Sequence, residues 1–380
     1  MNLARFSRIL TRYARKVYRA LLIRVLKNLD LIPVLDKILP AYLGKYSAHI
    51  EWDITFLPPP NTRTTWEKID LDYYLSRKQR VAKEDRIFPN PYGANLAIVV
   101  QGPIVSENSI TLRIIQHYLT RYPEACVVVS TWEDTVSADI APFVKLSQQG
   151  KIKLILNSDP NMPGLFNLNR QIISSKNGLE SVLQDFEYAM KTRTDQVFVA
   201  PRFLNHLHTL MSLDCDHSSD QAKIVISSLN TFAFRLYGYS DMFQFGKTKD
   251  LYDYWNQPLD TRDIKELTQV SPNLEVEARK RVVEVYLNTN YFVKKLKKMP
   301  NYELDESLLF VAEYFIVADA PSLGQKWFKN TNLSDRWGAG KFPSKSYEMS
   351  HIDWLGLQDN VDGWHQYAHL TKSEAFFLED

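Results

Sequence analysis

Two cationic side chains and a carboxylate alternate within five residues of the sequence, at Lys191, Arg193 and Asp195. A departing diphosphate needs its charge neutralised, either by a divalent metal held on a carboxylate or by cationic side chains. Asp195 could take the first role, and Arg193 or Lys191 the second. These residues are expected to form a loop that leads into a strand at Gln196–Val199. An exposed cluster of ions would explain the same residue types.

Three short apolar runs have the length and composition of buried parallel strands, and polar residues follow each run. The runs are Leu96–Val100, Ala125–Val129 and Ile152–Leu156. The residues that follow them are Gln101-Gly102-Pro103-Ile104, Ser130-Thr131-Trp132-Glu133-Asp134 and Asn157-Ser158-Asp159-Pro160. Because ligands of open parallel sheets bind at the carboxyl ends of the strands, this edge is a candidate binding site. Ordinary exposed turns are the alternative.

Helices are expected between these strands, over residues 109–121, 140–148 and 167–190. Asn169 and Arg170 lie at the start of the third helix, where a cation and backbone N–H groups could face an anion. Further strand candidates are Val197–Val199 and Ile224–Ser227. Repeated strand–helix units with short connections predict an α/β fold, with an open, mostly parallel sheet and helices on both faces.

Several enzyme classes lack their sequence signatures here. The chain has no GxGxxG after the first strand, no GxxxxGK[ST], and neither GxSxG nor HExxH. Its two cysteines, Cys126 and Cys215, rule out a disulfide framework and make a structural zinc site improbable. Dinucleotide-binding, P-loop, serine-hydrolase and zinc-protease functions are therefore poorly supported.

The N-terminal segment is strongly basic. Eight of the 46 basic residues lie in residues 1–29, and no acidic residue precedes Asp30. At helical spacing, Arg5, Arg8, Arg12, Arg15, Lys16 and Arg19 fall opposite Leu3, Phe6, Ile9, Leu10, Tyr13, Val17 and Leu21. This pattern predicts a basic amphipathic helix on an anionic membrane surface. Packing on the acidic body of the protein is the alternative, and nucleic acid is not an expected partner.

Three regions follow from these patterns. Residues 1–60 form the membrane-associating segment and a linker that ends in Pro58-Pro59-Pro60, and residues 61–94 form a charged and aromatic connector. Residues 95–380 form the α/β domain. No apolar run approaches the length of a membrane span, and a cleaved signal peptide is not expected.

Five motifs occur in an order and spacing that resemble the WavE lipopolysaccharide-synthesis family. They are Gln101-Gly102-Pro103-Ile104, Ser130-Thr131-Trp132-Glu133, Asn169-Arg170-Gln171 with Gly178-Leu179, Lys191-x-Arg193-x-Asp195, and Ser240-Asp241-x-x-x-Phe245-Gly246. The similarity covers roughly residues 95–320. It implies a GT-A-like glycosyltransferase that moves a sugar from a UDP-, CMP- or GDP-linked donor to a lipopolysaccharide core or related surface glycan.

The resemblance also implies a nucleotide-sugar site. The first and second strand ends would hold the base and ribose through Gln101, Gly102 and Asp134, and the Asp-x-Asp motif of this fold falls on Arg193-Thr194-Asp195. Asp195 would then hold Mn²⁺ or Mg²⁺ together with His351, or Arg193 would neutralise the charge without a metal. The full set of expected donor-site residues is Gln101, Gly102, Pro103, Trp132, Asp134, Asn169, Arg170, Lys191 and Arg193.

If the transfer inverts the anomeric configuration, it also calls for a carboxylate base near the acceptor hydroxyl. Asp241, which is expected to follow a strand, is the first choice, and a turn-capping role is its alternative. Glu284, in a helix expected over residues 282–298, is the second choice, and a solvated helix position would explain it as well. Asp353 and His351 lie among aromatic residues suited to stacking on sugar rings, or to packing of the C-terminal region.

Two other functions remain open at this stage. A sugar nucleotidyltransferase could use a similar sheet, although Gln101–Ile104 lacks the Gly-rich basic loop expected of one. A non-catalytic scaffold of polysaccharide synthesis is the other, because Arg193 stands where the first Asp of the metal motif would be. The expected location is the inner face of the cytoplasmic membrane, where the protein would meet a lipid-linked glycan acceptor.

Overall fold

The computed structural model describes residues 89–213, 222–262, 282–328 and 348–359, together with 361, 363 and 364. All of them belong to one compact unit, Thr64–Asp380. The expected N-terminal helix and most of the expected connector, residues 61–88, lie outside the described residues. None of the described helices is long and apolar enough to cross a membrane.

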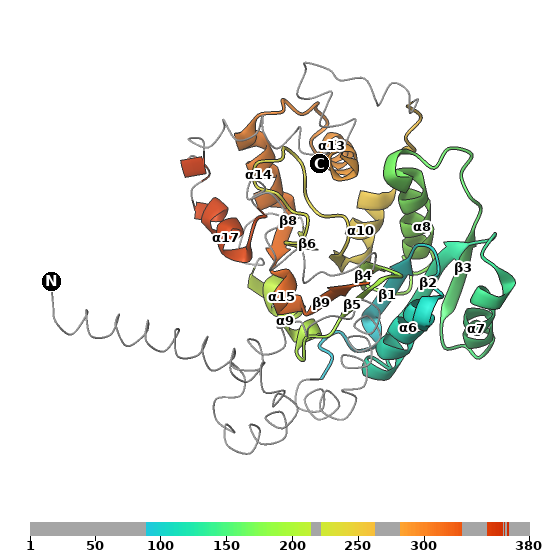
Figure 1. Cartoon of the computed structure of the whole chain (residues 1–380). Coiled ribbons are helices and arrows are strands. Elements are labelled where there is room, and N and C mark those ends of the chain that lie inside the picture. Colours follow the sequence, from blue (N-terminus) through green and yellow to red (C-terminus); the bar gives the residue numbers. More distant parts are fainter. Residues whose placement is uncertain are drawn as a thin grey trace, which may run out of the picture. The chain divides into compact units, whose positions relative to one another are not determined.

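A seven-stranded sheet organises the described part of the chain (Figure 1), in the order β3-β2-β1-β4-β7-β6-β8. Its strands are β1 (Leu96–Gln101), β2 (Cys126–Trp132), β3 (Lys153–Asn157), β4 (Tyr188–Arg193), β6 (Ile224–Ser227), β7 (Gln244–Lys247) and β8 (Phe315–Ala318). Strands β3, β2, β1 and β4 pair in parallel, and so do β6 and β8, whereas β7 runs antiparallel to both of its neighbours. The expected open, mostly parallel sheet is therefore confirmed.

Helices cover both faces of this sheet, as expected (Figure 1). On one face lie α8 (Leu168–Glu180) and α10 (Thr248–Trp255). Ser174 of α8 hydrogen-bonds Gln101, and Gly178 brings the helix against Val99 and Ser130. On the other face, Tyr118 of α6 (Ile110–Arg121) lies against Thr192. Helix α7 (Ser137–Gln148) joins β2 to β3.

The remaining elements follow the central strands in the chain. A two-stranded antiparallel sheet joins β5 (Gln196–Phe198) to β9 (Gln325–Trp327). The other helices are α9 (Phe203–Leu213), α13 (Val283–Leu296), α14 (Leu304–Tyr314), α15 (Ala320–Leu323) and α17 (His351–Asp359). Helix α13 confirms the helix expected over residues 282–298.

Two expected elements need correction. The helix expected over residues 167–190 ends at Glu180, and its last part belongs to β4. Lys191 and Arg193 consequently lie on a central strand and not in a loop, because β1 and β7 pair with β4 from both sides. The strand expected at Val197–Val199 is β5, which pairs with β9 outside the main sheet. Asp241 precedes β7 and does not follow a strand.

Candidate functional site

Three neighbouring strands carry a row of side chains at their carboxyl ends, on the face covered by α8. Gln101 is in register with Ser130 of β2 and with Arg193 of β4. Because side chains alternate along a strand, Trp132 lies on this same face, two residues beyond Ser130. The structure therefore brings Trp132, Gln101 and Arg193 together at one sheet edge, where ligands of open α/β sheets bind.

Arg193 and Asp195 form a two-point ion pair at the end of β4. Arg193 Nε donates to Asp195 Oδ1 at 2.9 Å, and Nη2 donates to Oδ2 at 3.2 Å. Trp327 of β9 adds a third hydrogen bond, from Nε1 to Asp195 Oδ2 at 3.0 Å. Its ring lies 5.8 Å from the Arg193 guanidinium. Both oxygens of a carboxylate that is only 5% exposed are thus already engaged within the protein.

Lys191 lies fully buried on the same face, two residues before Arg193. Its Nζ donates to the main-chain oxygen of Asp241 at 2.5 Å and lies 4.2 Å from the centre of the Trp255 ring. Burial lowers the pKa of Lys191 to about 7, although Asp241 and Asp195 act in the opposite direction. Lys191 therefore fixes the Asp241 segment and is not exposed to a ligand in this conformation.

Three carboxylates act electrostatically on Arg193. Burial alone would lower the pKa of this guanidinium, yet its pKa is raised above the ordinary value by Asp195, Asp241 and Glu284. Glu284 projects from the first turn of α13. Asp241 is only 4% exposed, and no residue in the described part of the chain donates a hydrogen bond to its carboxylate. A carboxylate without a hydrogen-bond donor of its own is a candidate acceptor for the proton of a ligand hydroxyl.

Helices α13 and α14 fix the segment that carries Asp241. Asn288 Nδ2 donates to the main-chain oxygens of Tyr237 and Tyr239, each at 2.9 Å. The Tyr239 hydroxyl donates to the main-chain oxygen of Ser307 at 2.6 Å. These buried hydrogen bonds anchor the irregular segment before β7 to the two helices.

A second charged group lies beside this row, at the start of α8. Arg170 forms an ion pair with Asp159, and its guanidinium carbon lies 5.9 Å from the centre of the Trp132 ring. The hydrogen bond to Asp159 and the negative charge of Asp134 both raise the pKa of Arg170. The hydrogen bond from Arg170 lowers the pKa of Asp159 below its usual range. Arg170 is partly exposed and Asp134 is exposed at this edge, so both side chains are open to solvent.

The turn after β1 is fixed by its own hydrogen bonds. Gly102 has a positive φ of 123°, and a side chain there would lie 3.1 Å from Thr194 Oγ1. The same Thr194 hydroxyl donates to the main-chain oxygen of Pro103 at 2.6 Å. Glycine is required at this position because other residues rarely adopt such a φ value. The turn therefore holds the exposed ring of Pro103 next to the end of β4.

The Asn169 side chain forms hydrogen bonds with main-chain groups inside the protein. Its Nδ2 donates to the main-chain oxygens of Met162 and Asp260, and its Oδ1 accepts the Asp260 N–H at 2.6 Å. The side chain is buried, at 2% exposure. These bonds connect the segment after α10 to the start of α8. Asn169 therefore supports the structure beside the carboxyl edge of the sheet, and its amide group is already engaged within the protein.

His351 and Asp353 lie at the start of α17. His351 Nδ1 lies 2.7 Å from the main-chain oxygen of Val317, and its ring stacks on Trp354. Asp353 Oδ2 accepts hydrogen bonds from the N–H and hydroxyl of Ser350. These contacts do not bring His351 to Asp195. Among the described residues, no group of three or more His, Cys, Asp or Glu side chains could hold a metal ion.

Sequence reasoning did not single out Trp327, Trp255 or Asn288. Trp327 is 132 residues from its partner Asp195, so no local spacing could indicate the contact. Asn288 sits inside a helix whose pattern is otherwise that of an ordinary packed element. The abundance of tryptophan, eight in the chain, was the only available signal, and it does not distinguish one position from another.

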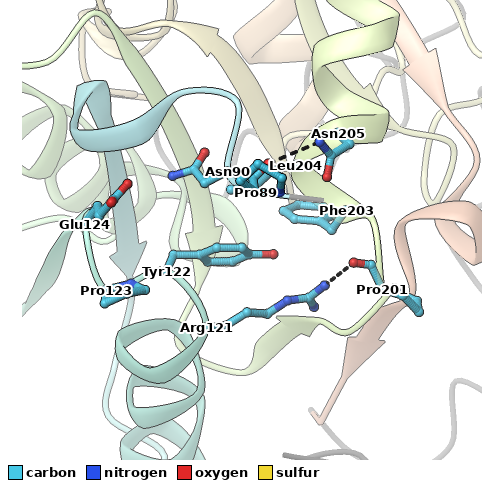
Figure 2. Close-up of a pocket in the computed structure, with 10 residues that line it drawn as sticks. All are labelled: Pro89, Asn90, Arg121, Tyr122, Pro123, Glu124, Pro201, Phe203, Leu204 and Asn205. Atoms are coloured by element: carbon cyan, nitrogen blue, oxygen red, sulfur yellow. Dashed lines mark hydrogen bonds between the residues drawn. The ribbon is translucent and has the colours of Figure 1, made fainter. Parts of the chain in front are cut away.

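A pocket of about 200 Å³ lies at the opposite end of the strands (Figure 2). Its lining comes from the segments before β1 and β2 and from the start of α9. Arg121 donates from its guanidinium to the main-chain oxygens of Phe198, Ala200 and Pro201 and so supports the turn after β5. None of the site residues expected from the sequence lines this pocket.

Comparisons with known proteins bear on the identity of the chain. No curated protein matches it in sequence. A mannosyltransferase from Pyrobaculum calidifontis, solved with GDP-mannose and Mn²⁺, is 11% identical, with a TM-score of 0.31 over 83% of this chain and 99% of that one. A 4-diphosphocytidyl-2C-methyl-D-erythritol synthase from Anaerococcus prevotii is 13% identical, with a TM-score of 0.27 over 45% and 79%. Both likenesses are too weak to assign a chemistry.

The family comparison is stronger, because it spans most of the chain. The pattern described as WavE lipopolysaccharide synthesis matches residues 96–378. This range contains the whole sheet and every residue of the site described above. The chain belongs to the WavE lipopolysaccharide-synthesis family.

Proposed function

We propose that this chain is a glycosyltransferase that moves a sugar from a nucleotide-sugar donor to a lipopolysaccharide core or related surface glycan. The proposal rests above all on Arg193, a partly exposed cation at the carboxyl edge of the sheet, with Asp241 and Glu284 within electrostatic reach. A cation can neutralise a leaving diphosphate, and a carboxylate can accept the proton of an acceptor hydroxyl in an inverting glycosyl transfer.

In the proposed reaction, Arg193 faces the diphosphate of the donor. The bond between the anomeric carbon and the diphosphate oxygen breaks, and its electron pair stays on the diphosphate. The acceptor oxygen bonds to the anomeric carbon, and its proton passes to Asp241. Glu284 is the second candidate for this proton transfer. Trp132 and Arg170 would contact the nucleotide next to this centre, with Asp134 at the ribose.

A divalent cation fits this site poorly. Asp195 is the carboxylate at the metal-motif position, and its oxygens accept three hydrogen bonds from Arg193 and Trp327. A metal would have to displace these donors and would meet the Arg193 charge at close range. The mechanism therefore assigns charge neutralisation to Arg193.

The first test is thermal denaturation with UDP, CMP and GDP, each with Mn²⁺ or with EDTA. A ligand that binds only the native state adds about 2.7 kcal/mol at one hundred times its dissociation constant. We expect one nucleotide to stabilise the protein, equally in both conditions, and Arg193→Ala to abolish the shift. Arg202→Ala, an exposed arginine outside the site, is the matched control.

A second variant separates binding from transfer. Asp241→Asn should bind the same nucleotide normally, but should fail to transfer sugar because it cannot accept the proton. If no nucleotide stabilises the wild type, the glycosyltransferase proposal fails and a non-catalytic scaffold becomes the better explanation of the family membership.

A further inference from the structure

The side chain of Asp195 connects two elements that are far apart in the sequence. Asp195 lies between β4 and β5, directly before Gln196, whereas Trp327 ends β9. The two meet because β5 and β9 pair, with Gln196 opposite Trp327. The main chain repeats the connection, since the Phe328 N–H donates to the main-chain oxygen of Asp195 at 2.8 Å. The β5–β9 sheet thus presents the Trp327 indole N–H to a carboxylate at the main sheet edge.

This arrangement restricts the Arg193 guanidinium on two sides. Asp195 accepts hydrogen bonds from Nε and Nη2 of Arg193, and the centre of the Trp327 ring lies 5.8 Å from the guanidinium carbon. An arginine held at two nitrogen atoms keeps its remaining N–H groups in a fixed direction, and planar guanidinium groups suit phosphate oxygens. Without Trp327, Asp195 loses a hydrogen bond that fixes its own orientation.

We propose that Trp327 and Asp195 are positioning residues that aim Arg193 at the diphosphate of the donor, and that Asp195 is not a metal ligand. The inference rests on the proposed function for the identity of the ligand. The structural part of the inference, that the orientation of Arg193 depends on Trp327, is independent of the proposed function. The ligand class is a nucleoside diphosphate bound by a fixed guanidinium without a divalent cation.

The structural part can be tested without ligand. In ¹⁵N-labelled wild-type protein, the Arg193 Nε–H should give a resonance protected from solvent exchange, assigned by its loss in Arg193→Lys. Trp327→Phe keeps a ring and removes the indole donor, so this resonance should shift or broaden. Trp354→Phe is the matched control, because the Trp354 indole N–H is buried on α17 with no hydrogen-bond partner among the described residues. An unchanged Arg193 signal in Trp327→Phe would overturn the inference.

The functional part is tested by the dissociation constants of UDP and GDP, with CMP as the monophosphate comparison, measured by calorimetry with Mn²⁺ and with EDTA. Trp327→Phe removes the hydrogen bond that orients Asp195, so Arg193 is held less firmly, and we expect nucleotide binding to weaken roughly ten-fold, or about 1.4 kcal/mol. Trp354→Phe should bind like the wild type. Binding that needs Mn²⁺ and loses this need in Asp195→Asn would make Asp195 a ligand and refute the proposal.

The two measurements distinguish the two possible failures. If the Arg193 resonance depends on Trp327 but the wild type binds no nucleotide, the positioning contact stands and the proposed function fails. If the wild type binds nucleotide and Trp327→Phe binds it equally well, the proposed function stands and the positioning role is refuted.

Discussion

The Lys191 ammonium group donates to the main-chain oxygen of Asp241 at 2.5 Å, inside the protein and against the Trp255 ring. It joins the central strand β4 to the segment that carries the proposed base. Burial lowers the pKa of Lys191 to about 7, from an ordinary value of 10.5. The contact therefore has a pH dependence that ordinary surface lysines do not have.

The free energy of unfolding should depend on pH because of the lowered pKa of Lys191. Between pH 7 and about 10, the unfolded chain keeps the Lys191 proton while the native state releases it, so this group makes the protein more stable as pH rises. Lys191→Met lacks this contribution. Urea denaturation at pH 7, 8 and 9 should show the wild type gaining up to about 1.4 kcal/mol per pH unit relative to the variant. A constant difference would show that Lys191 stays charged in the fold.

Sequence patterns are sufficient to predict β1, β2 and β3 of the main sheet. The apolar runs that became β1, β2 and β3 are continuous, and each is followed by a polar end, so length and composition identify them. The alternation of strands with helices then predicts a mostly parallel sheet. The first and second strand ends, with Gln101 and Trp132, were placed at one edge on this basis.

Strand β4 could not be recognised in the same way. Its second half, Lys191-Thr192-Arg193, is polar, because these side chains are accommodated by partners from distant segments. Trp255 and the Asp241 carbonyl take the Lys191 charge, and Asp195 with Trp327 takes that of Arg193. Apart from the Arg193–Asp195 pair, these contacts join residues that are far apart in the sequence, so the strand resembles a charged loop until the tertiary structure is known.

Gly178 is one position where the tertiary contact gives a sharp prediction. A Cβ there would lie 2.6 Å from Val99 Cγ1 and 3.2 Å from Ser130 Cβ. Gly178→Ala should push α8 away from the sheet and cost about 1–3 kcal/mol of stability. Gly356→Ala in α17 is the control, because nothing lies within 4 Å of its Cβ and the change should stabilise the helix by up to about 1 kcal/mol. Equal melting temperatures for the two variants would contradict the packing argument.

Asn169 gives a second stability prediction. Asn169→Ala leaves the Asp260 N–H and two main-chain oxygens without their partner, and each such group costs about 1–3 kcal/mol when buried. Asn205→Ala should cost much less, since its single hydrogen bond to Pro89 is exposed. Urea denaturation of the two variants measures the difference. If Asn169→Ala instead kept full stability and lost only nucleotide affinity, Asn169 would be a ligand contact, as the sequence first indicated.

The basic N-terminal segment is predicted to bind anionic membranes. Basic residues near an anionic surface contribute about 1 kcal/mol each, so the eight cations of residues 1–29 should bind vesicles rich in anionic lipid and ignore neutral ones. Replacing Arg5, Arg8, Arg12 and Arg15 with glutamate in the full chain should move the protein to the supernatant in a sedimentation assay.

Deleting residues 1–29 should have the same effect on sedimentation, and in cells it should shift the protein from the membrane to the soluble fraction. The apolar side of the segment makes a further distinction. If charge alone caused binding, high salt would release the wild type completely. Binding by an amphipathic helix should persist in part at high salt, because Leu3, Phe6, Ile9 and Leu10 would still be buried in the lipid. An unchanged distribution after deletion would refute membrane attachment through this segment and favour its packing on the protein itself.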